Sequence, residues 1–337
     1  CGFERTSGRR TCTLNRDGTE VVRSLFHNKR NSTLITVSVY AADHYTTLRC
    51  RATPLASLKD GITSTGIDLF EEESLRWPGF VEFDDVNGKV LTYSATDKLY
   101  KVWSMADPSK VLYRLPDETI EEIKISPGIM LIMQKRQDGL LPLLVRCIET
   151  GQVLSEFSQS IEPGKKINIV EQFNEKLILK QEDEPLRIVD LLTQSVVQVP
   201  NARFRDPSAF IFLYEYNTFL AFEHDKVTVW DFNGSLVRQF ENHNLFFPYA
   251  GIDHTSVIYI TQAQDVIISM CRDVLESEAG SSNQVSIHVS SILTGRCLAE
   301  LDQNKGDGPK ISALGYNEHY GDIITGDEDG YLQIWSN

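Results

Sequence analysis

Short stretches of alternating apolar and polar residues run along the whole chain, and Gly, Asp, Asn and Pro separate them. Alternation with a period of two predicts half-buried β-strands joined by tight turns. Helical periodicity of useful length is absent from the sequence. The first strands are predicted at residues 20–28, 33–40, 46–52 and 66–70, then at 79–84, 88–94, 98–104 and 110–115. The pattern therefore predicts an all-β chain built from four-stranded meanders.

The meander repeats along the sequence. Further units are predicted at residues 119–157, 166–199, 209–240, 256–301 and 310–336, the last with three strands. One position in the third strand recurs with steps of 43, 43, 41, 60 and 45 residues. We call it the slot, and it is filled by Trp103, Arg146, Val189, Trp230, Ser290 and Trp335. Seven units with a period of about 40 to 45 residues predict a seven-bladed β-propeller.

The ends of the chain complete this prediction. The last unit lacks an outer strand, and residues 10–15 have strand character but belong to no unit. We expect residues 10–15 to complete the last blade, since an unpaired strand edge promotes aggregation. The expected organisation is a single domain over residues 1–337, with a further domain possible before residue 1 because the chain opens on Cys1.

Three segments resemble the WD40-repeat family, whose units end in a Trp-Asp-like pair. They are Val229-Trp-Asp-Phe-Asn-Gly234, Val189-Asp-Leu-Leu-Thr193 and Thr325-Gly-Asp-Glu-Asp-Gly-Tyr-Leu-Gln-Ile-Trp335. The resemblance implies a rigid platform that binds peptides or domains on its faces as a subunit of a larger complex. The alternative within this family is a substrate-recognition subunit of a ubiquitin ligase, of the F-box or cullin-adaptor type.

Motifs of catalysis are absent from the sequence. It contains no Gly-x-Ser-x-Gly, no His-Glu-x-x-His, no Gly-x-Gly-x-x-Gly and no phosphate loop, and the seven His residues are scattered. We therefore expect no catalytic residues, no cofactor and no metal. An enzyme that assembles its site from several blades is the remaining alternative, because such a site leaves no local motif.

Composition and cysteine spacing indicate the class of protein and its cellular compartment. The 337 residues are 41% hydrophobic, which suits a globular core, and no uncharged run reaches the length of a membrane span. The six cysteines form no close pairs, so buried free thiols in a reducing compartment are the expectation. The chain is predicted to be nuclear or cytoplasmic, with no membrane insertion.

Charge is distributed unevenly. The net charge is −14, whereas residues 1–60 carry ten Lys or Arg and five Asp or Glu. Nucleic acid is a possible partner only through this basic region, which lacks the interleaved aromatics that stack on bases. The basic residues in question are Arg5, Arg9, Arg10, Arg16, Arg23, Lys29 and Arg30.

A second charge pattern lies in the turns. Acidic residues recur before the third strand of the units, and we expect them to form a negative face that attracts basic peptides of other proteins. The alternative is a structural role, because Asp in a tight turn often bonds its own backbone. The predicted acidic face consists of Asp97, Asp138, Asp183, Asp225, Asp327 and Asp329.

Two connections between units carry the candidate partner residues. Residues 241–252 are apolar where polar residues are expected, and residues 201–205 add Arg and Phe on the same face. Aromatic and Arg side chains are typical anchors of interfaces. The predicted partner-binding residues are Arg203, Phe204, Arg205, His243, Phe246, Phe247 and Tyr249. The alternative is that the aromatic residues fold inward and fill the gap between blades.

Overall fold

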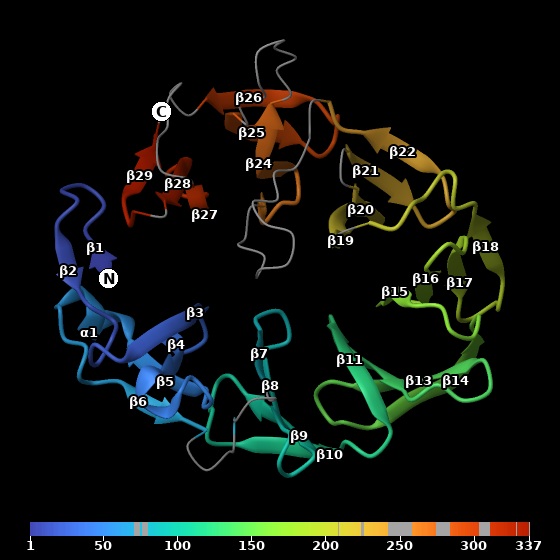
Figure 1. Ribbon diagram of the computed structural model, residues 1–337, viewed down its shortest axis with the longest axis horizontal. Coiled ribbons are helices and arrows are strands. Elements are labelled where there is room, and N and C mark those ends of the chain that lie inside the picture. Colours follow the sequence, from blue (N-terminus) through green and yellow to red (C-terminus); the bar gives the residue numbers. More distant parts are fainter. Residues whose placement is uncertain are drawn as a thin grey trace. The chain divides into compact units, whose positions relative to one another are not determined.

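The computed structural model describes residues 1–70, 75, 80–207, 209–223, 226–241, 258–273, 284–302, 311–327 and 329–336. The chain divides into two compact units, Cys1–Pro163 and Gly164–Asn337. The division falls between the third and the fourth large sheet, so each unit consists of whole sheets. Figure 1 colours the sheets in sequence order from blue to red.

Unit 1 contains three four-stranded antiparallel sheets, which we number as blades 1 to 3. Blade 1 consists of β3 (Glu20–Asn28), β4 (Thr33–Tyr40), β5 (Arg49–Pro54) and β6 (Ile67–Leu69). Blade 2 consists of β7 (Phe80–Asp84), β8 (Lys89–Ser94), β9 (Leu99–Ser104) and β10 (Val111–Pro116). Blade 3 consists of β11 (Ile120–Ser126), β12 (Ile129–Gln134), β13 (Leu140–Cys147) and β14 (Val153–Ser160). The predicted meanders are confirmed here.

Unit 2 contains blades 4 to 7. Blade 4 consists of β15 (Ile167–Phe173), β16 (Lys176–Gln181), β17 (Leu186–Asp190) and β18 (Val196–Val199). Blade 5 consists of β19 (Ala209–Leu213), β20 (Thr218–Glu223), β21 (Lys226–Asp231) and β22 (Leu236–Gln239). Blade 6 consists of β23 (Ile258–Ile260), β24 (Val266–Asp273), β25 (Gln284–Ser291) and β26 (Cys297–Asp302). Blade 7 consists of β27 (Ile311–Asn317), β28 (Asp322–Asp327) and β29 (Leu332–Trp335).

With seven successive antiparallel sheets and almost no helix, the fold class is the predicted seven-bladed β-propeller. The described helices are short: η1 (Ala41–Asp43), α1 (Leu55–Lys59) and η2 (Tyr214–Tyr216). The expectation of one domain over residues 1–337 stays a prediction, and each unit is described by itself.

The N-terminal strand differs from the expectation. Residues 10–15 were expected to form the fourth strand of blade 7, but β2 (Arg10–Cys12) pairs with β1 (Gly2–Phe3), and blade 7 has three described strands. The physical reason lies in α1, which the sequence pattern did not predict. Cys12 and Leu14 are buried against Leu58 of this helix, so the apolar residues of the segment pack within unit 1.

The slot residues lie on the third strand of their blades, as predicted. Each slot tryptophan donates its indole N–H to a threonine hydroxyl: Trp103 to Thr92 at 2.9 Å, Trp230 to Thr228 at 3.0 Å and Trp335 to Thr325 at 3.2 Å. A buried indole needs such an acceptor. Thr92 and Thr325 belong to the neighbouring second strand, whereas Thr228 precedes its tryptophan on the same strand.

Hydrophobic cores fill the space between consecutive blades of each unit. In unit 1, one cluster joins Ile35 of blade 1 to Trp103 of blade 2, and a second joins Leu91 of blade 2 to Ile132 of blade 3. In unit 2, three clusters join blades 4 and 5, 5 and 6, and 6 and 7. The inner strands of consecutive blades in each unit therefore bury side chains against one another, whereas outer strands such as β14 and β22 are mostly exposed.

Candidate functional site

The connection between blades 4 and 5 contains three of the predicted partner residues, Arg203, Phe204 and Arg205. We call residues 200–207 the connecting segment. The backbone N–H groups of Arg203 and Phe204 both donate to the carbonyl of Pro200, at 2.8 and 3.1 Å. Two bonds to one carbonyl close a single helical turn. The segment is thus folded locally.

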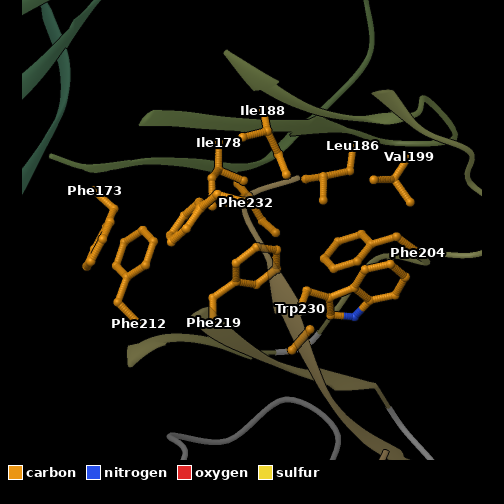
Figure 2. Packing of buried hydrophobic residues seen from close by; sticks show 12 residues of the cluster. Phe173, Ile178, Leu186, Ile188, Val199, Phe204, Phe212, Phe219, Trp230 and Phe232 are labelled. Atoms are coloured by element: carbon orange, nitrogen blue, oxygen red, sulfur yellow. The ribbon is translucent and has the colours of Figure 1, made fainter. Parts of the chain in front are cut away.

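Phe204 lies in the core, which corrects its prediction as a partner anchor. Its exposed fraction is 0%, and its ring meets Trp230 edge-on with centroids 5.4 Å apart and Phe219 with centroids 6.2 Å apart. Figure 2 shows the ring of Phe204 beside the indole of Trp230. Edge-to-face contact is a favourable arrangement of aromatic rings. Phe204 therefore fastens the connecting segment to blade 5.

Lys180 fastens the same segment from blade 4. This lysine is fully buried on β16, and its Nζ lies 2.6 Å from Oδ1 of Asp206, 3.0 Å from Oδ1 of Asn201 and 2.9 Å from the carbonyl oxygen of Gln181. A buried ammonium is tolerated only with such partners. Because Asn201 and Asp206 lie near the two ends of the connecting segment, one side chain holds both ends.

Arg203 and Arg205 are exposed on either side of the buried Phe204. Asp206, the nearest acidic residue in sequence, is bound by Lys180. In the part of the chain that the structure describes, no carboxylate forms an ion pair with either guanidinium. Within the described ranges, the segment thus presents two guanidinium groups without an ion-pair partner on a fixed backbone.

The other predicted partner residues, His243, Phe246, Phe247 and Tyr249, lie outside the described residues, and so does Asp225 of the predicted acidic face. The partner-binding prediction for the first four and the acidic-face prediction for Asp225 therefore stay predictions.

Five of the predicted acidic residues are described, and several have structural roles in their turns. Asp97 accepts a hydrogen bond from the hydroxyl of Ser94 at 2.9 Å, and Asp327 accepts from the N–H groups of Asp329 and Tyr331 at 3.1 and 2.8 Å. Such bonds are what favours Asp in tight turns. The prediction that these turns attract a basic partner stays a prediction.

Neighbouring charges weaken the acidic character in unit 1. Asp97 is followed by Lys98, and the turn with Asp138 also contains Lys135 and Arg136. Asp138 and Asp183 have left-handed backbones, with φ of 49° and 58°, a conformation that Asp tolerates better than most residues. In unit 2 the turn with Asp183 lies between Glu182 and Glu184, of which Glu184 is ion-paired with Lys165, and the last acidic turn contains both Asp327 and Asp329.

The basic region at the N-terminus is partly neutralised by local ion pairs. Arg16 lies 2.8 Å from Asp68, Lys29 lies 3.4 Å from Asp85, and Arg9 lies 3.7 Å from Glu4.

Among the described residues, no group of three or more His, Cys, Asp or Glu is placed to hold a metal ion. The described helices include none that is long and apolar enough to cross a membrane.

A family model described as "Domain of unknown function (DUF7899)" matches residues 1–335. The chain belongs to the DUF7899 family. No curated protein matches this DUF7899 chain. Among solved structures it is similar to the computationally designed Ika8 protein, with 18% identity, a TM-score of 0.48 and coverage of 98% of this chain and 100% of that chain.

Proposed function

We propose that this chain is a non-catalytic interaction scaffold, a propeller subunit of a larger nuclear or cytoplasmic complex. The observation that carries the proposal is the connecting segment, which presents Arg203 and Arg205 around the buried Phe204. Because Phe204 and Lys180 already order the segment, a partner that binds there pays little further ordering entropy. The two arginines therefore suit a binding interface, because their backbone is ordered before a partner binds.

The chemistry of the two arginines indicates the partner. A guanidinium offers a planar fork of N–H donors that matches a carboxylate, and such charge-assisted bonds are stronger than neutral ones. The proposed partner at this segment is therefore an acidic stretch of another protein.

The proposal includes blades of the WD40 type and a reducing compartment. The first point is supported by the Trp103–Thr92 and Trp335–Thr325 hydrogen bonds and by the Trp230-Asp231 pair. The second is supported by the cysteines, all six of which are free thiols, including the buried Cys50 and Cys271.

The test is the binding of a fluorescent Glu-rich peptide, followed by anisotropy at low and at physiological salt. The double variant Arg203→Ala/Arg205→Ala should bind at least about tenfold more weakly, because each lost charge-assisted bond is worth about 1.5 kcal/mol. Arg296→Ala is a control for the loss of one exposed arginine elsewhere, since Arg296 lies in the turn between β25 and β26 of blade 6. Equal binding by the double variant and the control would contradict the proposal.

A further inference from the structure

The turns between the first and second strands of blades 4 to 7 lie at the end of unit 2 opposite to the connecting segment, because each blade is an antiparallel meander. We call the residues of these turns, 174–175, 214–217, 262–264 and 318–320, the turn surface. In an antiparallel sheet, successive turns alternate between the two ends. The turn surface is therefore separate from the site of the proposed function.

Hydrogen bonds join the turns of blades 5, 6 and 7 into a continuous surface. Between blades 5 and 6, the N–H of Glu215 donates to Oε1 of Gln264 at 3.2 Å, and Nε2 of Gln264 donates to the carbonyl of Phe212 at 3.4 Å. Between blades 6 and 7, Oε1 of Glu318 accepts from the N–H of Gln262 at 2.8 Å and from the hydroxyl of Tyr259 at 3.0 Å. These bonds hold the three turns in fixed relative positions.

Exposed tyrosines stand on this surface. Tyr214, Tyr216 and Tyr320 have exposed fractions of 44%, 38% and 57%. The ring of Tyr214 rests on the buried Phe173, with centroids 5.1 Å apart, and so continues the blade 4–5 core into solvent. Several exposed aromatic rings in one region are uncommon on a free surface and are typical of interaction sites.

The charge of the turn surface is negative. Glu175, Glu215 and Glu318 are exposed, and among the described residues neither Glu175 nor Glu215 has a cationic partner. Lys176, which follows Glu175, is bound to Asp190 at 2.6 Å. Carboxylates beside tyrosine rings complement lysine and arginine, whose charge the acids attract and whose cationic heads lie well over aromatic faces.

We propose that the turn surface binds a basic segment of a partner protein, with tyrosines and glutamates together contacting its Lys and Arg side chains. A nucleic acid or an anionic membrane fits poorly, because its phosphates would be repelled by the exposed carboxylates. This inference does not depend on the proposed function, since it involves another end of the unit and a partner of opposite charge.

The test measures a fluorescent peptide of alternating Lys, Arg and Ala by anisotropy, beside a peptide with Gln in place of the basic residues. Wild type should bind the basic peptide at least about tenfold more tightly than the Gln peptide, with an affinity that falls as salt rises. The variant Glu175→Lys/Glu215→Lys should lose at least about tenfold in affinity. A matched control, Glu182→Lys/Glu241→Lys, changes the net charge equally at exposed positions outside the turn surface and should lose less than about threefold.

A second variant tests the aromatic half. Tyr216→Ser/Tyr320→Ser should weaken the basic peptide about threefold to tenfold while the unfolding midpoint and the binding of the Glu-rich peptide stay unchanged. If the charge variant and its control lost the same affinity for the basic peptide, net charge alone would explain the effect, and the proposed site would be contradicted. Full binding by the tyrosine variant would overturn the two-part recognition.

Discussion

Blade 5 and blade 7 place a tryptophan in the same slot, and the two side chains have different surroundings. Trp230 is 1% exposed, with Phe204 against its ring and β22 paired beyond it. Trp335 is half-buried on β29, the last described strand of its sheet, where Leu332 and Ile334 are 57% and 43% exposed. The repeat thus sets the geometry of the slot, whereas the neighbouring elements decide how much the slot contributes to stability.

The largest difference is expected when each tryptophan is removed. Trp230→Ala leaves a cavity in the blade 4–5 core and should lower the free energy of unfolding by about 3–5 kcal/mol. Trp335→Ala removes a side chain that water already reaches and should cost about 1–2 kcal/mol. Urea unfolding followed by fluorescence of the remaining tryptophans measures both free energies. Equal costs would show that Trp230 and Trp335 contribute equally to stability.

A smaller difference is expected at the hydroxyl partners of the indoles. Thr228→Val keeps the shape of the side chain and leaves the buried N–H of Trp230 without its acceptor, which should cost about 1–2 kcal/mol. Thr325→Val should cost about half of that or less, because water can replace the acceptor near the half-buried Trp335. The same urea titration provides the measurement. A larger cost at Thr325 would show that blade 7 is better shielded than its exposures indicate.

The smallest effect concerns the residue after the slot, which is Asp231 in blade 5, Ser336 in blade 7 and Asp190 in blade 4. The ammonium of Lys176 at 2.6 Å holds the pKa of the Asp190 carboxyl well below its usual range, and the N–H of Thr193 acts in the same direction. A carboxyl with a lowered folded-state pKa stabilises the fold above its unfolded pKa of about 3.9, and this stabilisation is lost as the pH falls further.

Asp190→Asn should therefore lower the thermal midpoint at pH 7 slightly, and the difference from wild type should shrink as the pH falls below about 4. Lys176→Gln should produce the same pH dependence, because it removes the other half of the pair. Thermal unfolding from pH 7 to pH 2 is the measurement. A difference that stays constant over this range would show that the carboxyl charge is not its cause.

The strands and the slot could be predicted because alternation and turn residues are local signals. Strand bounds such as Glu20–Asn28 and Thr33–Tyr40 agree with the pattern because the polar turn Lys29-Arg30-Asn31-Ser32 interrupts the alternation between them. Helix α1 could not be predicted, since five residues are too few for a 3.6-residue period to appear. Because α1 was not predicted, residues 10–15 were assigned to blade 7 and not to the neighbourhood of this helix.

The candidate site was predictable only in its residue types. Arg and Phe in residues 201–205 predict an interface at the connecting segment, but the direction of the Phe204 side chain depends on the space beside Trp230, which the local sequence pattern does not contain. Lys180 left one signal, a lysine directly after the apolar run Leu177-Ile178-Leu179, and that signal predicts a polar partner without naming Asp206. The turn surface could not be predicted, because the local sequence pattern does not show that four separate turns are neighbours.

Each sheet in the described part of the chain pairs only strands that follow one another in sequence. Loop closure therefore costs little entropy at any step, and contacts of short sequence separation favour fast formation of a hairpin, then a blade. A chain of this kind behaves as a nearly one-dimensional array, in which the stability of one blade depends mainly on its immediate neighbours. Damage to blade 5 should accordingly spread to blades 4 and 6 first, and hydrogen exchange along unit 2 would report it as a gradient.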